Sequence, residues 1–162
     1  MASRRSIALT ALLALVAGLL AGLDFDRTLV AMPAWQAVGA QGWAAFSRHA
    51  DLGPGLVLYP LEAVGGLLLA TAATASVWFD QRAASAGFFA LLIAVGGAVG
   101  GLVMTAFAAP VMLELAAQTD QGALQQSLDA FQFRGDIRGM FQVVAFAAAV
   151  AAMALFAARA NE

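Results

Sequence analysis

The sequence predicts an all-α integral membrane protein: a four-helix bundle with short interfacial helices in the two long extracytoplasmic loops. Hydrophobic residues make up 62% of the 162 residues and charged residues only 11%, whereas soluble domains have about 45–50% and about 25%. Four apolar runs are each near or above the ~18–20 residues that cross a bilayer. We therefore expect a single transmembrane domain over residues 1–162.

The composition also excludes several function classes. The chain has no Cys, which excludes disulfides and thiolate metal sites. Its only His is His49, so two His ligands to one haem cannot come from one chain. The net charge is −2, and clustered positive charge of the kind that binds phosphate is missing, so we expect no nucleic-acid partner.

The first span, about residues 6–32, follows Arg4 and Arg5. Its apolar run exceeds the ~7–15 residues usual in a signal peptide, so we interpret it as a retained helix. Pro33 disfavours helical geometry in the residue before it, which predicts that the helix ends there.

The second span covers about residues 54–79 and starts at Pro54, a favourable first-turn residue. The third span covers about 84–110 and the fourth about 139–158. The polar residues Asp80 to Arg82 are predicted to form the turn between spans two and three.

The distribution of Arg predicts the orientation. Four Arg lie in the short segments at the termini and the tight turn, while the other four are spread over two longer loops. Cytoplasmic segments carry the higher density of positive charge. We therefore expect a multi-pass protein of the cell inner membrane with both termini cytoplasmic and both long loops outside.

Both long loops have helical patterns. In residues 34–50, Trp35 with Val38 and Trp43 with Phe46 lie at helical spacing, which favours short interfacial helices. From about 120 to 133 apolar residues recur at i, i+4 and i+7, which predicts an amphipathic helix. Gly135 would then permit a turn into the fourth span.

Glycines in the first and third spans predict close helix packing. Gly18 and Gly22 form a GxxxG pattern, and residues 96–101 contain two overlapping copies. Small residues let helix backbones approach closely within a membrane. The glycines either pack helices inside one chain or form a homo-oligomer contact.

Glu62 is the sharpest candidate for chemistry. It lies about eight residues into the second span, ~12 Å along the helix axis, so its carboxyl group reaches the hydrocarbon region. Tyr59 and Gly66 share its helix face, which leaves room for a ligand. Ionisable groups at this depth are costly and commonly functional. Glu62 either forms a structural ion pair with an Arg or transfers a proton to or from a ligand.

His49 lies just before the second span, at the same side of the membrane. It is a solvated surface residue, or it acts as a base near neutral pH. A metal shared by His49, Asp51 and Glu62 has no recognisable ligand motif, so we expect no bound metal.

Charged residues also end the first span and begin the fourth. Asp24 and Arg27 lie at one, and Arg134 and Arg138 at the other. One interpretation is that these residues only anchor helix ends. The other is that they join His49, Glu62 and Tyr59 at one site, since all of them map to one half of the membrane. The opposite half has almost no polar group, so a transporter or channel is the least favoured class.

Several motifs resemble those of small bacterial four-span membrane proteins related to the anthrone oxygenase-like family. They are GLDFDR at 22–27, MPAW at 32–35, WAAFSRHADL at 43–52, LYPLE at 58–62, AAPVM at 108–112 and IRG at 137–139. Fungal relatives in this family oxidise polyphenolic anthrones to anthraquinones. The resemblance implies insertion of oxygen into an electron-rich aromatic ring of a deprotonated substrate, with no bound metal or other cofactor.

Roles for individual residues agree with that chemistry. The catalytic candidates are His49, Glu62 and Tyr59, with His49 or Glu62 as the base. The substrate-binding candidates are Arg48, Trp35, Trp43, Arg138, Asp24 and Arg27. Arg48 or Arg138 would stabilise the anion, and Trp35 or Trp43 would stack on the ring. The expected partners are membrane lipids and a lipophilic aromatic or quinone ligand. The alternative is a non-enzymatic accessory subunit of a membrane complex, or a lipophile binder, in which the polar cluster only fixes helix ends.

Overall fold

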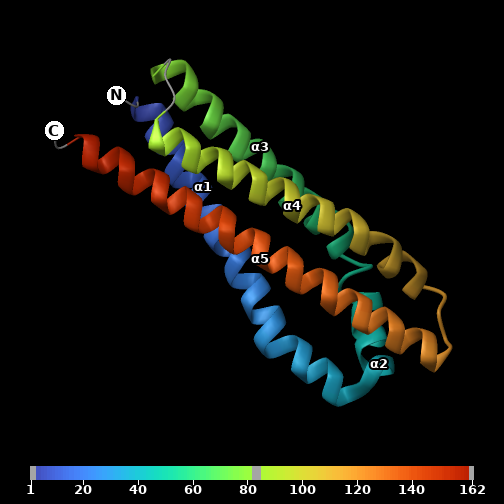
Figure 1. Ribbon diagram of the computed structural model, residues 1–162. Helices are drawn as coiled ribbons and strands as arrows, with labels where there is room; N and C mark the ends of the chain where they lie inside the picture. The colour runs from blue at the N-terminus through green and yellow to red at the C-terminus, as the bar shows by residue number, and fades with distance from the viewer. Residues whose placement is uncertain (1–2, 82–84, 161–162) are drawn as a thin grey trace.

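The computed structural model describes residues 3–81 and 85–160, which form a bundle of long helices without strands (Figure 1). The elements in chain order are α1 (Arg4–Asp26), the π-helical segment η1 (Arg27–Ala31), α2 (Met32–His49), α3 (Gly55–Gln81), α4 (Ala86–Leu115) and α5 (Gln121–Ala160). Within the described residues, four helical stretches are long and apolar enough to cross a membrane. The prediction of an all-α four-helix bundle is confirmed, and the chain is a multi-pass membrane protein.

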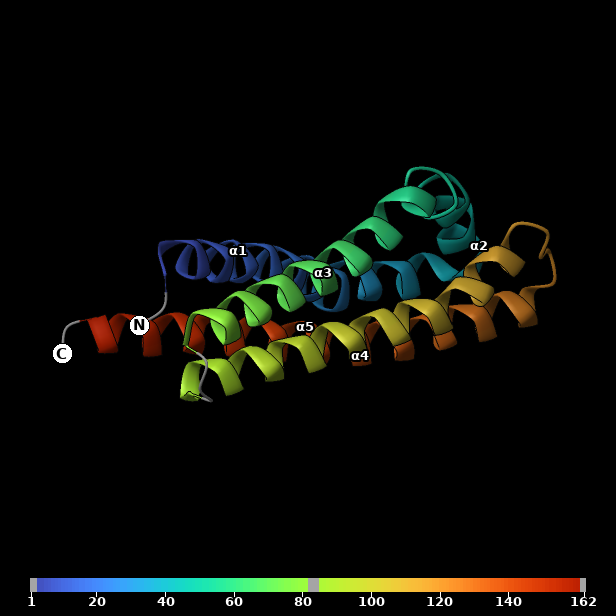
Figure 2. The ribbon, with the colours of Figure 1, turned by 90° about the horizontal axis from the view of Figure 1, so that it is seen from above.

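The helices surround a common centre. Helices α1 and α4 each pack against both α3 and α5, with the most extensive contact between α4 and α5. The two chain termini lie at the same end of the bundle in Figures 1 and 2. We call this the terminal end, and we call the opposite end, which holds α2 and the α4–α5 connection, the distal end.

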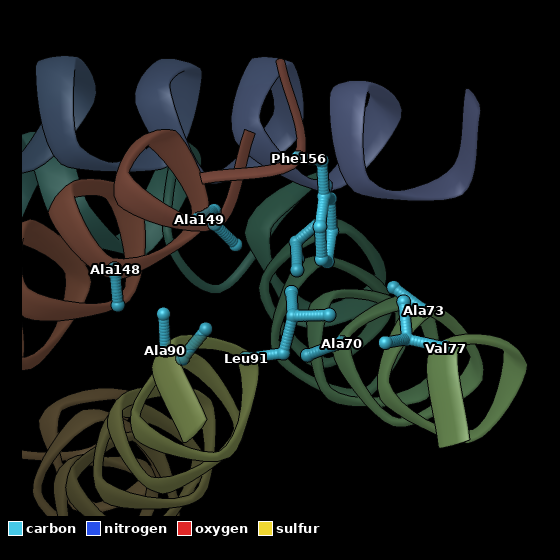
Figure 3. Close-up of a cluster of buried hydrophobic side chains, with 11 residues drawn as sticks. Ala70, Ala73, Val77, Ala90, Leu91, Ala148, Ala149 and Phe156 are labelled. Carbon is cyan, nitrogen blue, oxygen red and sulfur yellow. The ribbon is translucent and has the colours of Figure 1, made fainter. Parts of the chain in front are cut away.

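Small side chains make the core of the terminal half compact. Figure 3 shows Ala70, Ala73 and Val77 of α3 facing α4 and α5. Glycines bring α4 and α5 close together: a Cβ on Gly97 would lie 2.8 Å from the carbonyl oxygen of Phe141, and one on Gly100 would lie 2.5 Å from the Phe141 ring. These two glycines therefore pack helices within one chain.

A hydroxyl-rich contact joins α1 to α3 at the terminal end, in the half of the bundle where the sequence predicts almost no polar group. The buried Ser6 hydroxyl lies 2.5 Å from Asp80 Oδ2 and 2.6 Å from the Ser76 hydroxyl. Asp80 belongs to the last turn of α3 and not to a turn between spans. Arg82, the other end of that predicted turn, lies outside the described residues. The contact holds α1 and α3 together at this end.

The sequence predicts that the first helix ends before Pro33, but the structure continues as helix through this residue. Helix α2 begins at Met32 with Pro33 in its first turn, where the missing N–H is no loss. In η1 the Met32 N–H donates to the Arg27 carbonyl, five residues earlier, so the wider π turn precedes the proline. The break comes instead at Gly39, whose φ of 83° and ψ of 164° only glycine adopts easily. Figure 1 shows the chain changing direction within α2.

The predicted amphipathic helix and fourth span are one continuous helix. Helix α5 runs for 40 residues through Gly135 without a turn, because a glycine inside a helix costs only about 1 kcal/mol. The apolar face of its first turns packs on α2 and α4 in a second core at the distal end. That core consists of Met32, Ala40, Trp43, Ala44, Met112, Leu115, Leu124, Leu128 and Phe131. Both long loops are thus helical, as the sequence predicts. Their helices are not separate short helices, however, but continue from the spans.

Candidate ligand site in the distal half

A cavity of about 340 Å³ lies where α1, η1, α2 and α3 meet, with α4 and α5 behind it. The exposed side chains Leu23, Phe46 and Leu58 are part of its lining and mark its opening between α1 and α3. Volumes of roughly 300–1,000 Å³ are typical of small-molecule sites. The cavity is therefore large enough for an aromatic ligand that arrives from the lipid side of the bundle.

Two ion pairs hold the cavity wall together. Arg138 Nη2 of α5 lies 2.5 Å from Asp24 Oδ1 of α1. Arg27 Nη2 of η1 lies 3.2 Å from Asp51 Oδ1. The side chains of both aspartates are at most 9% exposed. Each carboxylate is therefore buried together with the cation that compensates its charge.

Asp51 connects the segment between α2 and α3 to this network. Its Oδ1 atom also accepts a hydrogen bond of 2.7 Å from the Tyr59 hydroxyl. Its Oδ2 atom is buried and has no hydrogen-bond partner among the described residues. One acceptor of a buried carboxylate thus remains for a donor group, which buried polar atoms normally have.

Aromatic rings surround the Arg27 guanidinium. Its central carbon lies 4.4 Å from the centre of the Phe131 ring, and 5.7 Å from the ring centres of Trp35 and Tyr59. Cation–π contacts of this kind fix a guanidinium in place. Arg27 is therefore held as a stationary positive charge at the cavity wall.

Glu62 of α3 is half-buried and lines the same cavity. In residues 3–81 and 85–160 there are two ion pairs, and neither includes Glu62. A carboxyl group that lies inside a membrane span and has no cation paired to it can exchange a proton with a ligand. The lining carboxyl groups outside these pairs are Glu62 and Asp26, and Asp26 is exposed. Glu62 is thus the more buried of the two groups in this cavity that are free to act as a base.

The structure brings together most of the residues that the sequence selected. The lining includes the predicted residues Asp24, Arg27, Trp35, Tyr59, Glu62 and Arg138. It does not include His49, Arg48 or Trp43. His49 therefore does not line this cavity with Glu62.

The three outlying residues have other surroundings. His49 is exposed at the end of α2, and within the described residues no group of three His, Asp or Glu is placed to hold a metal ion. Arg48 donates to the carbonyl oxygens of Leu115, at 3.1 Å, and Gln118. It therefore binds free carbonyls at the end of α4, where a helix favours positive charge. Trp43 is fully buried and packs on Phe131, at 5.6 Å between ring centres, so it cannot stack on a ligand.

Two polar lining residues, Thr105 and Gln142, are not among the site residues that the sequence predicts. Each interrupts a long apolar run, which is the signal that could have identified it. Asp51 was considered only as a residue that orients His49 or shares a metal with His49 and Glu62, although it lies at the centre of the network. Its contacts join residues far apart in the chain, and no local pattern shows them.

Comparison of the chain with models of protein families, with curated proteins and with solved structures finds no match in any of the three. The residues of the cavity therefore carry the functional argument.

Proposed function

We propose that the chain binds a lipophilic aromatic or quinone-type molecule in the distal cavity and removes a proton from it. The observation that carries this proposal is the unpaired, half-buried carboxyl group of Glu62 in a cavity where the two buried aspartates, Asp24 and Asp51, are paired. An acidic hydroxyl or ring C–H would lie next to Glu62. Arg138 would stabilise the resulting oxyanion, and Trp35 would contact the ring.

The resemblance to the anthrone oxygenase-like family extends the proposal to a reaction. Glu62 would take a proton from the central ring carbon of an anthrone. The carbanion would combine with dioxygen, and loss of water would give the anthraquinone. This sequence consumes one dioxygen per anthrone and needs no metal or other cofactor from the chain.

We further propose a membrane and an orientation for the protein. The Arg-rich short segments favour the cell inner membrane with both termini cytoplasmic, so that the cavity lies in the outer half. A substrate would then reach Glu62 from the outer leaflet, through the opening between α1 and α3.

A second candidate is a structural role without catalysis. The pairs of Asp24 with Arg138 and of Arg27 with Asp51 tie α1, η1 and α5 to the segment before α3. In that case the chain would be an accessory subunit of a membrane complex, and the charges would only fix the distal helix ends.

The substitution Glu62→Gln separates the two candidates. Gln keeps the shape but cannot accept the proton, so oxidation of 1,8-dihydroxyanthrone should fall about 100-fold or more. The free energy of unfolding should change by less than about 1 kcal/mol, because no cation loses its partner. Oxidation is followed by absorbance and stability by thermal unfolding, both in detergent.

The matched control is Glu114→Gln, the same chemical change at an exposed position that does not line the cavity. It should leave both measurements unchanged. A large loss of stability in Glu62→Gln, with unchanged behaviour toward the anthrone, would favour the structural candidate.

A further inference from the structure

A second cavity, of about 120 Å³, lies on the other side of α3, between the first turns of α3 and the last turns of α4. Leu56 and Pro60 of α3 and Ala109 and Leu113 of α4 line it, and all four side chains are exposed. The surroundings of a membrane span are lipid chains. This cavity therefore opens toward lipid through a different gap from the first.

The two cavities meet at the polar network. Both linings include Arg27, Asp51, Tyr59, Thr105 and Arg138. Figure 2 shows that α3 diverges from α4 toward the end that begins at Gly55, which is where the second cavity lies. The polar network can thus be approached from both sides of α3.

The linings of the two cavities differ in chemistry. The first adds the charged Glu62 and Asp24 and the ring of Trp35 to the shared residues. The second adds only apolar side chains and a glycine, among them Ala108 and Met112. The first suits a polar aromatic head group, and the second suits a hydrocarbon chain.

We propose that the ligand is an amphiphile whose alkyl or isoprenoid chain runs from the polar network through the second cavity to the lipid. Its aromatic head, with an ionisable hydroxyl group, occupies the first cavity. The unpaired Oδ2 of Asp51 lies at the residue shared by both cavities and leaves an acceptor for a hydroxyl of the head. This inference rests on the proposed function, since it places the head beside Glu62.

The test compares two probes in nanodiscs at fixed ratios of probe to lipid. One is 2-hydroxy-1,4-naphthoquinone, and the other is the same molecule with a dodecyl chain at carbon 3. Ala108→Phe fills the second cavity from α4. The dodecyl probe should then lose affinity by about 10-fold or more, as expected when a filled site is overpacked. The probe without a chain should bind as before.

Matched variants keep the result specific. Ala106→Phe makes the same change at an exposed position of α4 that lines neither cavity, and it should affect neither probe. Ala109→Phe, at the outer mouth of the second cavity, repeats the test if Ala108→Phe does not fold. Thermal unfolding identifies the folded variants.

The outcomes separate this inference from the proposed function. One outcome is that the wild type binds the short probe while Ala108→Phe weakens the binding of both probes equally or of neither. In that case the alkyl chain of the ligand does not occupy the second cavity, and only this inference fails. If the wild type binds neither probe, the ligand site itself is wrong and both proposals fail.

Discussion

Among single residues, Asp51 is the acceptor at which the hydrogen bonds of Arg27 and Tyr59 meet. One of its oxygen atoms accepts from both Arg27 and Tyr59, while its side chain is only 3% exposed. Removing its charge would leave the Arg27 guanidinium, itself 14% exposed, without compensation. Arg27 therefore depends on Asp51 more than Tyr59 does, because a neutral hydroxyl tolerates the loss of a partner better than a cation.

Asp51→Asn should lower the free energy of unfolding by about 3–5 kcal/mol, the usual cost of breaking one side of a buried ion pair. Tyr59→Phe removes one hydrogen bond and should cost only about 1 kcal/mol. Unfolding in mixed detergent micelles measures both values. Equal losses in the two variants would mean that the charge of Arg27 is compensated by another group.

The sequence predicted most of the candidate site residues, but it predicted only in part which of them lie together in the cavity. Glu62 and Tyr59 share a face because they are three residues apart on one helix, which a sequence shows directly. The pairing of Arg138 with Asp24 joins α5 to α1 across the bundle. Such a contact depends on helix packing and not on spacing. His49, close to Asp51 in the chain, is exposed and does not line the cavity.

At the scale of elements, Gly39 decides where the first helical stretch reverses. The signal in the sequence was Pro33, yet a proline in the first turn of a helix is tolerated. Gly39 has the unusual backbone angles and nothing within 4 Å of its missing Cβ. A side chain at position 39 would thus be opposed by backbone geometry and not by a steric clash with a neighbour. Gly135 carries no such geometry, and α5 passes straight through it.

Gly39→Ala should therefore destabilise the protein by about 1–3 kcal/mol through backbone strain alone. Gly65→Ala is the matched change inside α3, where a Cβ also meets nothing within 4 Å. It should stabilise the protein by up to about 1 kcal/mol, because alanine favours helix over glycine. Thermal unfolding of both variants in one detergent gives the comparison. Gain of stability in Gly39→Ala would show that this turn does not need its positive φ.

At the scale of the whole molecule, the helices are longer than a bilayer is thick. Helix α5 has 40 residues and so spans ~60 Å, about twice the ~30 Å of hydrocarbon. The distal core, built on Trp43, Leu115 and Leu128, closes the part of the bundle that extends beyond the apolar spans. Composition predicted the four spans because lipid demands long apolar runs, but it could not show that two of them continue into this core.

The orientation of the bundle can be tested in this chain because it has no Cys. Cys replacing Asp120, exposed beside the start of α5, should react with a membrane-impermeant maleimide in cells whose inner membrane is intact. Cys replacing Arg159 should react only after that membrane is permeabilised. Val150→Cys is the control, since Val150 is exposed on the apolar half of α5 and should face lipid, where no water-soluble reagent reaches it. The reverse pattern for positions 120 and 159 would place the termini outside, and the cavity of Glu62 would then open toward the inner leaflet.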